Sequence, residues 1–367
     1  MEKDYPNSHH SIERNKQLEQ WDKQYVWHPF TQMQDYQTEP SLIFERGEGA
    51  YLFDIYGNKY FDANSSLWVN IHGHARQEIN DGLKAQLDKI AHSTLLGPGN
   101  VPSIELARRL VEITPENLTK VFYSDNGSTA VEVALKMAFQ YWIQTKETVP
   151  DKLRFIKFEG AYHGDTIGSV SVGGVDLFHG AFGPLLFECH NVPYPVYSKY
   201  STDKTPEDIY KISLAMCERI MEEHPGEVPA LIIEPLIQGA GGMRSCAPGF
   251  LRALREICDT HGVLLILDEV FTGFGRTGTM FAFEQEEIVP DLIALSKGLT
   301  GGYLPLAVTM TSDTIYEGFL GQYAEFKTFF QCHSYTGNQL GCAAALACLD
   351  VFEKEQTLEK LQPVILY

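Results

Sequence analysis

The chain has 367 residues, 44% of them hydrophobic, and a net charge of −19. This length allows one large α/β domain with a smaller one attached, and the acidic balance argues against nucleic acid or an anionic membrane surface as a main partner. The seven cysteines form no Cys-x-x-Cys pair, a spacing that favours free thiols in a reducing compartment over disulfides or a metal site. We expect a cytoplasmic protein, because the first residues lack an apolar signal and no run approaches the roughly 18 apolar residues of a membrane span.

The N-terminal part of the chain predicts a small region of mixed structure. An aromatic-rich stretch around Phe30 follows a polar lead-in, and alternating side chains at 51–55 and 59–62 predict a β-hairpin. The next stretch carries Leu67 and Trp68 and is too polar and rich in glycine for a regular element. A loop with such residues is a candidate to face a ligand, although Trp68 could equally pack beneath a domain interface.

A turn of small polar residues, 124–128, separates a strand at 120–123 from an amphipathic helix at about 129–141. The free N–H groups and the dipole of a helix start favour a phosphate, and Gly127 lets the backbone approach it closely. The spacing matches neither a dinucleotide-binding fingerprint nor a P-loop. The alternative is that Ser128 belongs to an ordinary helix cap.

Tyr162 follows a strand at 154–158 and stands close to Gly160 and Gly164. An aromatic ring between glycines at the C-terminal end of a strand can lie flat over a planar ligand, which makes Tyr162 a candidate site residue. Asp165 can orient this ring or a neighbouring backbone group. The alternative is that Tyr162 is a buried packing residue with its hydroxyl satisfied.

Strand-then-helix units recur along the rest of the chain. We expect helices at 79–90, 103–113, 207–224, 249–261, 313–320 and 339–355, strands at 230–233, 263–267, 291–295 and 306–311, and a surface excursion at 184–206. Such repetition implies an α/β fold with a mostly parallel central sheet flanked by helices.

The central stretch contains two apolar strands that end in charged residues. The strand at 263–267 is typical of one covered on both faces and ends in Asp268, at the position where open α/β sheets bind ligands. After a glycine-rich loop, the strand at 291–295 leads to Lys297. A lysine in an apolar setting among small residues can lose its proton, and a neutral amine is what Schiff-base chemistry needs.

Asp268 and Lys297 come to the same edge of the sheet if the segment between them makes a single crossover. A pyridoxal phosphate ring needs such a pair: a lysine to hold its aldehyde and a carboxylate to keep the pyridine nitrogen protonated. Taken alone, Asp268 could cap a neighbouring element and Lys297 could be a solvated loop lysine. Together with Gly127 and Tyr162, the pair predicts a pyridoxal phosphate site.

These residues, in this order, resemble the class III (ω-type) aminotransferases, which are pyridoxal-phosphate enzymes of fold type I. The most specific marks are Asp268-Glu269-Val270, the loop 272–278 and Ser296-Lys297-Gly298. The stretches 27–31, 162–166 and 333–338 are similar to the branch that aminates 8-amino-7-oxononanoate to 7,8-diaminononanoate in biotin biosynthesis. The resemblance implies transamination as the activity, on small-molecule amino donor and keto acceptor.

The resemblance also implies a role for each matching residue. Lys297, Asp268 and Tyr162 are the implied catalytic residues. Pyridoxal phosphate would contact Gly127, Ser128, Tyr162, Asp268, Val270 and Lys297, and also Tyr335 and Thr336 of a neighbouring subunit, which makes a homodimer the expectation. The implied substrate pocket is lined by Phe30, Leu67, Trp68, Tyr162 and Ser334. No metal is implied.

Two departures from the family's pattern leave points open. Leu67-Trp68 stand where some members carry two consecutive aromatic residues, so the amino donor is S-adenosylmethionine or lysine. Members continue into a C-terminal domain whose arginine meets a substrate carboxylate, and this chain ends before it. We therefore expect an N-terminal segment of a small domain at 1–75, the large cofactor-binding domain at 76–337 and the start of a truncated C-terminal domain at 338–367.

Two rival interpretations use the same residues. The chain could be an ω-amino acid:pyruvate transaminase or another class III aminotransferase, which a screen of amino acceptors would separate. It could also be an inactive fragment that only binds pyridoxal phosphate, in which case no amino donor would convert the cofactor.

Overall fold

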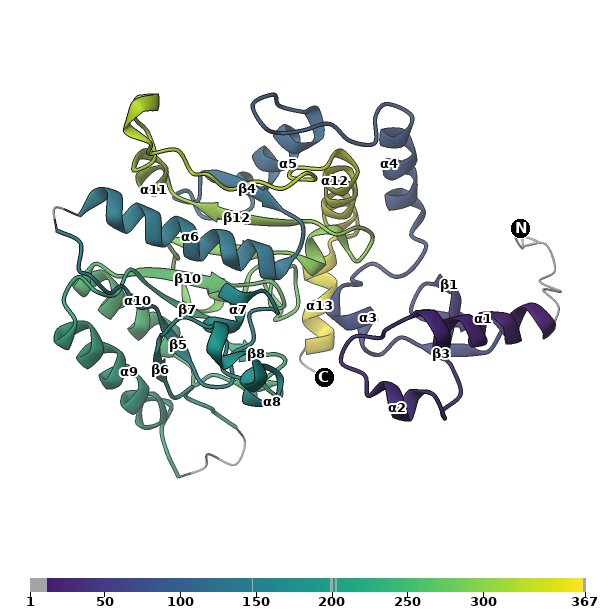
Figure 1. Ribbon diagram of the computed structural model, residues 1–367, viewed down its shortest axis with the longest axis horizontal. Helices are drawn as coiled ribbons and strands as arrows, with labels where there is room; N and C mark the ends of the chain where they lie inside the picture. The colour runs from purple at the N-terminus through teal and green to yellow at the C-terminus, as the bar shows by residue number, and fades with distance from the viewer. Residues whose placement is uncertain (1–11, 147, 199–200, 202, 366–367) are drawn as a thin grey trace. The chain divides into compact units, whose positions relative to one another are not determined.

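The computed structural model of the protein describes residues 12–146, 148–198, 201 and 203–365 (Figure 1). They pack as two compact units: the residues up to Leu67 together with His72–Gln77, and Trp68–Ile71 together with the residues from Glu78 onward. The division into 1–75, 76–337 and 338–367 stays a prediction. Within the described part of the chain, no helix has the length and apolarity needed to cross a membrane.

The smaller unit holds an antiparallel sheet in the order β1-β2-β3. Its elements are α1 (Ile12–Tyr25), α2 (Met33–Tyr36), β1 (Phe44–Glu48), β2 (Tyr51–Asp54), β3 (Lys59–Phe61) and most of the turn α3 (Ser65–Trp68). The expected hairpin is confirmed as β2 and β3. Its turn is tied by Asp54, whose Oδ1 accepts hydrogen bonds from the backbone N–H groups of Tyr56 and Asn58 at 2.9 and 2.8 Å.

The larger unit is built on a seven-stranded sheet in the order β4-β12-β11-β10-β7-β5-β6. The strands are β4 (Lys120–Ser124), β5 (Ile156–Phe158), β6 (His190–Val192), β7 (Ala230–Ile233), β10 (Leu264–Asp268), β11 (Leu292–Leu295) and β12 (Ala307–Thr311). Strand β12 pairs antiparallel with both β4 and β11, and the remaining strand pairs of this sheet are parallel. The expected α/β fold with a mostly parallel sheet is confirmed.

Both faces of this sheet are buried, which explains why its strands are apolar without alternation. In β10, Leu265 and Leu267 belong to one core cluster and Ile266 belongs to the other. Helix α6 (Gly127–Thr145) packs on the face of Ile266, and it crosses the front of the sheet in Figure 1. The opposite face carries four helices: α5 (Val101–Glu112), α9 (Pro206–Glu223), α10 (Phe250–His261) and α12 (Gln339–Glu355).

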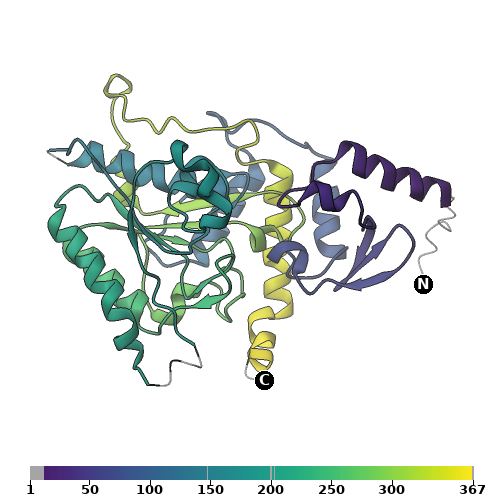
Figure 2. The same ribbon diagram turned by 60° about the horizontal axis from the view of Figure 1, so that its bottom comes forward.

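Most of the longer helices follow the sequence expectation: α4 (Gln77–Leu87), α5 (Val101–Glu112), α9 (Pro206–Glu223), α10 (Phe250–His261), α11 (Asp313–Glu317) and α12 (Gln339–Glu355). The sequence analysis did not predict α7 (Ile167–Ser171), α8 (Asp176–His179) and α13 (Thr357–Ile365). The 3-10 turns are η1 (Gly180–Leu185), η2 (Ala282–Glu286), η3 (Lys297–Thr300) and η4 (Tyr323–Glu325). Figure 2 shows α12 and α13, in yellow, as one column beside the sheet.

One expectation for the larger unit is wrong in part. The segment 184–206 is more than a surface excursion, because it contains the edge strand β6, paired in parallel with β5. A second small hairpin, β8 (Ile237–Gln238) with β9 (Arg244–Ser245), follows β7. Because β5, β7, β10 and β11 run parallel, the polar residues that follow them gather at one edge of the sheet.

Candidate active site

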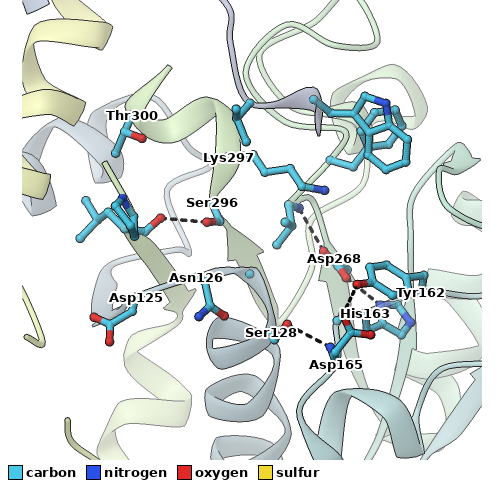
Figure 3. A pocket seen from close by; sticks show the side chains of 18 of the residues that line it. Asp125, Asn126, Ser128, Tyr162, His163, Asp165, Asp268, Ser296, Lys297 and Thr300 are labelled. Carbon is cyan, nitrogen blue, oxygen red and sulfur yellow. Dashed lines mark hydrogen bonds and ion pairs between the residues drawn. The ribbon is translucent and has the colours of Figure 1, made fainter. Parts of the chain in front are cut away.

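A cavity of about 630 Å³ opens at this edge of the sheet, in the larger unit. The predicted site residues that line it are Trp68, Gly127, Ser128, Tyr162, Asp268, Val270 and Lys297. They come from segments that follow β4, β5, β10 and β11 and from the stretch at 68–71. Figure 3 shows the side chain of Lys297 extending into the cavity toward the side where Asp268 lies.

Lys297 begins the 3-10 turn η3 directly after β11, with a backbone φ of 46°. Such a left-handed conformation is costly for a residue with a side chain and is typical of functional sites. Its Nζ lies 4.9 Å from the centre of the Trp68 ring and 5.8 Å from that of Phe271. Burial lowers the pKa of this amine, opposed by the negative charges of Asp268 and Glu234. The site thus favours a neutral amine more than water does.

Asp268 ends β10 and is buried, with 4% of its surface exposed. Its Oδ2 lies 2.7 Å from Nδ1 of His163, and its Oδ1 accepts a hydrogen bond from the backbone N–H of Val270 at 3.0 Å. A buried carboxylate needs such partners to offset the loss of water. The two bonds fix the orientation of the Asp268 carboxyl group at the cavity.

The turn before α6 lies at the cavity wall, as predicted. Asn126 caps the helix in a capping box with Thr129, so the first turn is held by side chains as well as backbone. A Cβ on Gly127 would lie 2.5 Å from Cγ1 of Val270, so only glycine allows this approach. Ser128 Oγ accepts a hydrogen bond from the backbone N–H of Asp165 at 3.2 Å and ties the helix start to the segment after β5.

Tyr162 lies on that segment and faces the cavity (Figure 3). Its hydroxyl donates a hydrogen bond to Oδ2 of Asp165 at 2.7 Å, and its backbone N–H donates to Oε1 of Glu234 at 3.0 Å. Burial, followed by the hydrogen bond to Asp165, raises the pKa of Tyr162. The phenol therefore stays protonated and keeps its role as a donor.

Five predicted residues do not line this cavity. Phe30 and Leu67 belong to the smaller unit. Ser334, Tyr335 and Thr336 precede α12, where the Thr336 hydroxyl accepts a hydrogen bond from the backbone N–H of His333 at 3.1 Å. The ring of Tyr335 lies against His92, with centres 4.8 Å apart. The substrate and cofactor roles of these residues stay predictions.

The structure places several residues at or near the cavity to which the sequence analysis assigned no role. His163 and Glu234 line the cavity and are almost fully buried, and Phe271 places its ring near Lys297. A signal for Glu234 was present, because it follows a buried strand just as Asp268 does. Nothing in the sequence distinguishes His163, whose only mark is its place beside Tyr162.

Comparison with known proteins identifies the family. The model of the family described as "Aminotransferase class-III" matches residues 32–365. The chain belongs to the class III aminotransferases. A relative from Nitratidesulfovibrio vulgaris, named adenosylmethionine-8-amino-7-oxononanoate aminotransferase, is 54% identical over 96% of this chain, which spans 65% of that relative's length. The family resemblance noted in the sequence is confirmed.

Solved structures of class III aminotransferases have the same fold. The adenosylmethionine-8-amino-7-oxononanoate aminotransferase of Methanocaldococcus jannaschii matches with a TM-score of 0.88 at 50% identity, covering 96% of this chain and 78% of the other. An ω-transaminase from Pseudomonas jessenii, in complex with PMP, matches with a TM-score of 0.88 at 31% identity, covering 93% and 76%. The expected fold class is confirmed by both matches.

Class III aminotransferases use pyridoxal phosphate, and the cavity fits this cofactor. An amine with a lowered pKa and an oriented, buried carboxylate line the same cavity. The start of α6, with the close approach that Gly127 allows, offers a phosphate site in its wall. Pyridoxal phosphate requires these three groups: an amine for its aldehyde, a carboxylate for its ring nitrogen and a binding site for its phosphate.

Proposed function

We propose that this class III aminotransferase transfers an amino group to 8-amino-7-oxononanoate, with S-adenosylmethionine as the donor, in biotin biosynthesis. The observation that carries the substrate is the 54% identity, over 96% of the chain, with a relative named for this reaction. The reaction type is supported by the geometry, in which Lys297 and Asp268 line one cavity. Lysine is the alternative donor, because Leu67-Trp68 does not discriminate between the two.

The side chains of the cavity divide the chemical work. Bound pyridoxal phosphate supplies an aldehyde and an electron sink. Lys297 would hold the aldehyde and, once released, would take a proton from the donor carbon and return it, for which a lowered amine pKa is suited. Asp268 would pair with the ring nitrogen, and Tyr162 and Val270 would cover the ring. Gly127 and Ser128 would bind the phosphate at the start of α6.

The proposal includes a homodimer in which Tyr335 and Thr336 of one subunit contact the phosphate bound in the other. It is supported by the position of these residues outside the cavity of their own chain, on a segment that His333 ties to Asp125 of the cavity wall at 3.0 Å. Phe30, Leu67, Trp68 and Ser334 would contact substrates. We also propose a cytoplasmic location, which suits the free thiols of the seven cysteines.

A half-reaction tests the proposal. The chain is loaded with pyridoxal phosphate, and its absorbance is followed while S-adenosylmethionine or lysine is added. Conversion to the amino form of the cofactor by one donor, followed by recovery of the original spectrum on adding 8-amino-7-oxononanoate, is the expected result. A chain that binds the cofactor and responds to neither donor would refute the proposed reaction and favour the inactive fragment.

A second candidate is an ω-transaminase that uses pyruvate. It is favoured by the solved ω-transaminases that match this chain at 30–32% identity with TM-scores of 0.87 to 0.88. The same titration decides between them, because an ω-transaminase would recover its spectrum with pyruvate and not with 8-amino-7-oxononanoate.

A further inference from the structure

Glu234 is a buried carboxylate at the cavity to which the proposed reaction gives no role. It follows β7 directly, as Asp268 follows the neighbouring strand β10, and 4% of its surface is exposed. It lines the cavity together with Tyr162 and Lys297. Carboxylates are rarely buried to this extent unless they are paired or hydrogen-bonded. The hydrogen bonds that Glu234 accepts therefore indicate its role.

Both oxygens of Glu234 accept hydrogen bonds from backbone N–H groups of two separate segments. Oε1 accepts from Tyr162 at 3.0 Å, and Oε2 accepts from Gly239 at 2.9 Å. A backbone N–H can only donate, so both positions must be acceptors. An ionised carboxylate meets this demand, whereas an amide or a protonated carboxyl group presents a hydrogen to one of the two donors.

Several titratable groups interact electrostatically with Glu234. Burial raises its pKa to about 7, assisted by the negative charge of Asp268 and opposed by His163 and the two backbone donors. Lys297 and Tyr194 also interact electrostatically with it. With a pKa of about 7, Glu234 loses an acceptor position when it takes up a proton near neutral pH.

We propose that Glu234 is a positioning residue of this site: by joining the backbones of Tyr162 and Gly239, it holds the Tyr162 ring and the cavity wall in the arrangement that binds pyridoxal phosphate. This inference rests on the proposed function. Glu234 acts through Tyr162 and touches no reacting atom. Its ionised form is the one that holds both segments.

Glu269 provides a matched control. It is also fully buried with a pKa raised to about 7, but it does not line the cavity. Its Oε2 accepts a hydrogen bond from the Thr272 hydroxyl at 2.5 Å, and its Oε1 accepts one from the backbone N–H of Phe283 at 3.0 Å. A hydroxyl can accept as well as donate, so glutamine at 269 can keep both bonds, whereas glutamine at 234 cannot.

The test measures the affinity of the cofactor-free chain for pyridoxal phosphate, by absorbance, between about pH 6 and pH 9. For the unaltered chain, the affinity should fall as the pH drops through about 7, where Glu234 takes up a proton. Glu234→Gln should bind about tenfold more weakly at the upper end of this range and should lose that step in the pH profile, because one buried N–H stays unpaired. Glu269→Gln should keep the step.

A second variant covers the case in which Glu234→Gln does not fold, which circular dichroism would reveal. Glu234→Asp keeps the charge but is one methylene too short to reach both segments, so it should also bind more weakly. The positioning role is overturned if the foldable variants at 234 match the unaltered chain in affinity and pH profile. If the unaltered chain itself does not bind pyridoxal phosphate, the proposed function fails as well, and this outcome is distinguishable from the first.

Discussion

Lys297 combines a strained backbone with a buried amine. The proposed reaction depends on the nitrogen atom of this amine, which would hold the aldehyde of the cofactor. Borohydride treatment of the chain loaded with pyridoxal phosphate should fix the cofactor to this residue, which mass spectrometry of peptides would locate. Lys297→Ala should abolish this fixation, because the cofactor has lost its amine. Lys136→Ala is the control, since Lys136 lies exposed on α6 and should leave the fixation unchanged. Fixation at another lysine would contradict the assignment.

Asp268 is the second residue on which the site depends. Asp268→Asn keeps the size of the side chain and removes its charge, so we expect kcat to fall by about 10² to 10⁴, the usual range for the loss of a group that acts on proton transfer. The cofactor should stay bound, because Lys297 and the start of α6 are unaltered. Steady-state kinetics with 8-amino-7-oxononanoate measure the effect, and unchanged turnover would refute the pairing with the ring nitrogen.

Glu269 allows a prediction about stability rather than catalysis. Its pKa is raised from 4.5 to about 7 by burial, so its proton stabilises the folded state below about pH 4.5, and this contribution is lost as the pH rises through about 7. The shift corresponds to about 3 kcal/mol. Glu269→Gln should therefore gain stability relative to the unaltered chain between about pH 4.5 and pH 7, as measured by urea unfolding. A constant difference over this range would contradict the raised pKa.

Individual residues also show where sequence reasoning reaches its limit. Asp268 and Lys297 could be paired in advance because each follows an apolar strand and their chemistry fits one cofactor. The purpose of Glu234 could not be foreseen, since it depends on two backbone donors that lie 72 and 5 positions away along the chain. A hydrogen bond between loops leaves no periodic signal.

At the scale of elements, the close packing of α6 against the segment after β5 depends on glycine. Gly164 has a φ of +113°, and a Cβ there would lie 1.9 Å from Oγ of Ser128. Gly164→Ala should destabilise the chain by about 1 to 3 kcal/mol and weaken the binding of pyridoxal phosphate, because Ser128 must move. Gly180→Ala is the matched control, as a Cβ at 180 meets no atom within 4 Å and φ is −55°. Thermal unfolding of both variants tests the difference.

The same scale explains which elements could be predicted. Strands β7 and β11 are apolar at every position, and β10 is apolar up to its last residue, Asp268, because helices cover both faces of the sheet; this pattern is visible in the sequence. Strand β6, with His190 and Asn191, was missed because it pairs only at the sheet edge through its backbone. Strand β1 was missed for a similar reason, since its sequence Phe-Glu-Arg-Gly-Glu has no alternation.

At the scale of the whole molecule, several residues of the predicted site lie away from the cavity. Phe30 and Leu67 belong to a separate compact unit, and Tyr335 and Thr336 precede α12 outside the cavity. The resemblance to class III aminotransferases implies a role for each of them, and these roles stay predictions. Neither spacing nor periodicity within one chain contains this information.

Mixed dimers test the contact between subunits. If Thr336 serves the neighbouring subunit, Lys297→Ala and Thr336→Ala chains should each be inactive alone, whereas a mixture refolded together should recover activity. In the mixed dimer, the chain with Thr336→Ala keeps its own Lys297 and receives an intact Thr336 from its partner, so one site is complete. The measurement is transamination before and after refolding.

Two controls make this result specific. A chain that carries both substitutions, refolded with the Lys297→Ala chain, should recover no activity, because neither chain in this mixture contains Lys297. Thr336→Ser keeps the hydroxyl that accepts the backbone N–H of His333, so it should remain active alone. If the Lys297→Ala and Thr336→Ala chains form mixed dimers by native mass spectrometry and stay inactive, Thr336 acts within its own subunit, and the proposed contact across the interface is refuted.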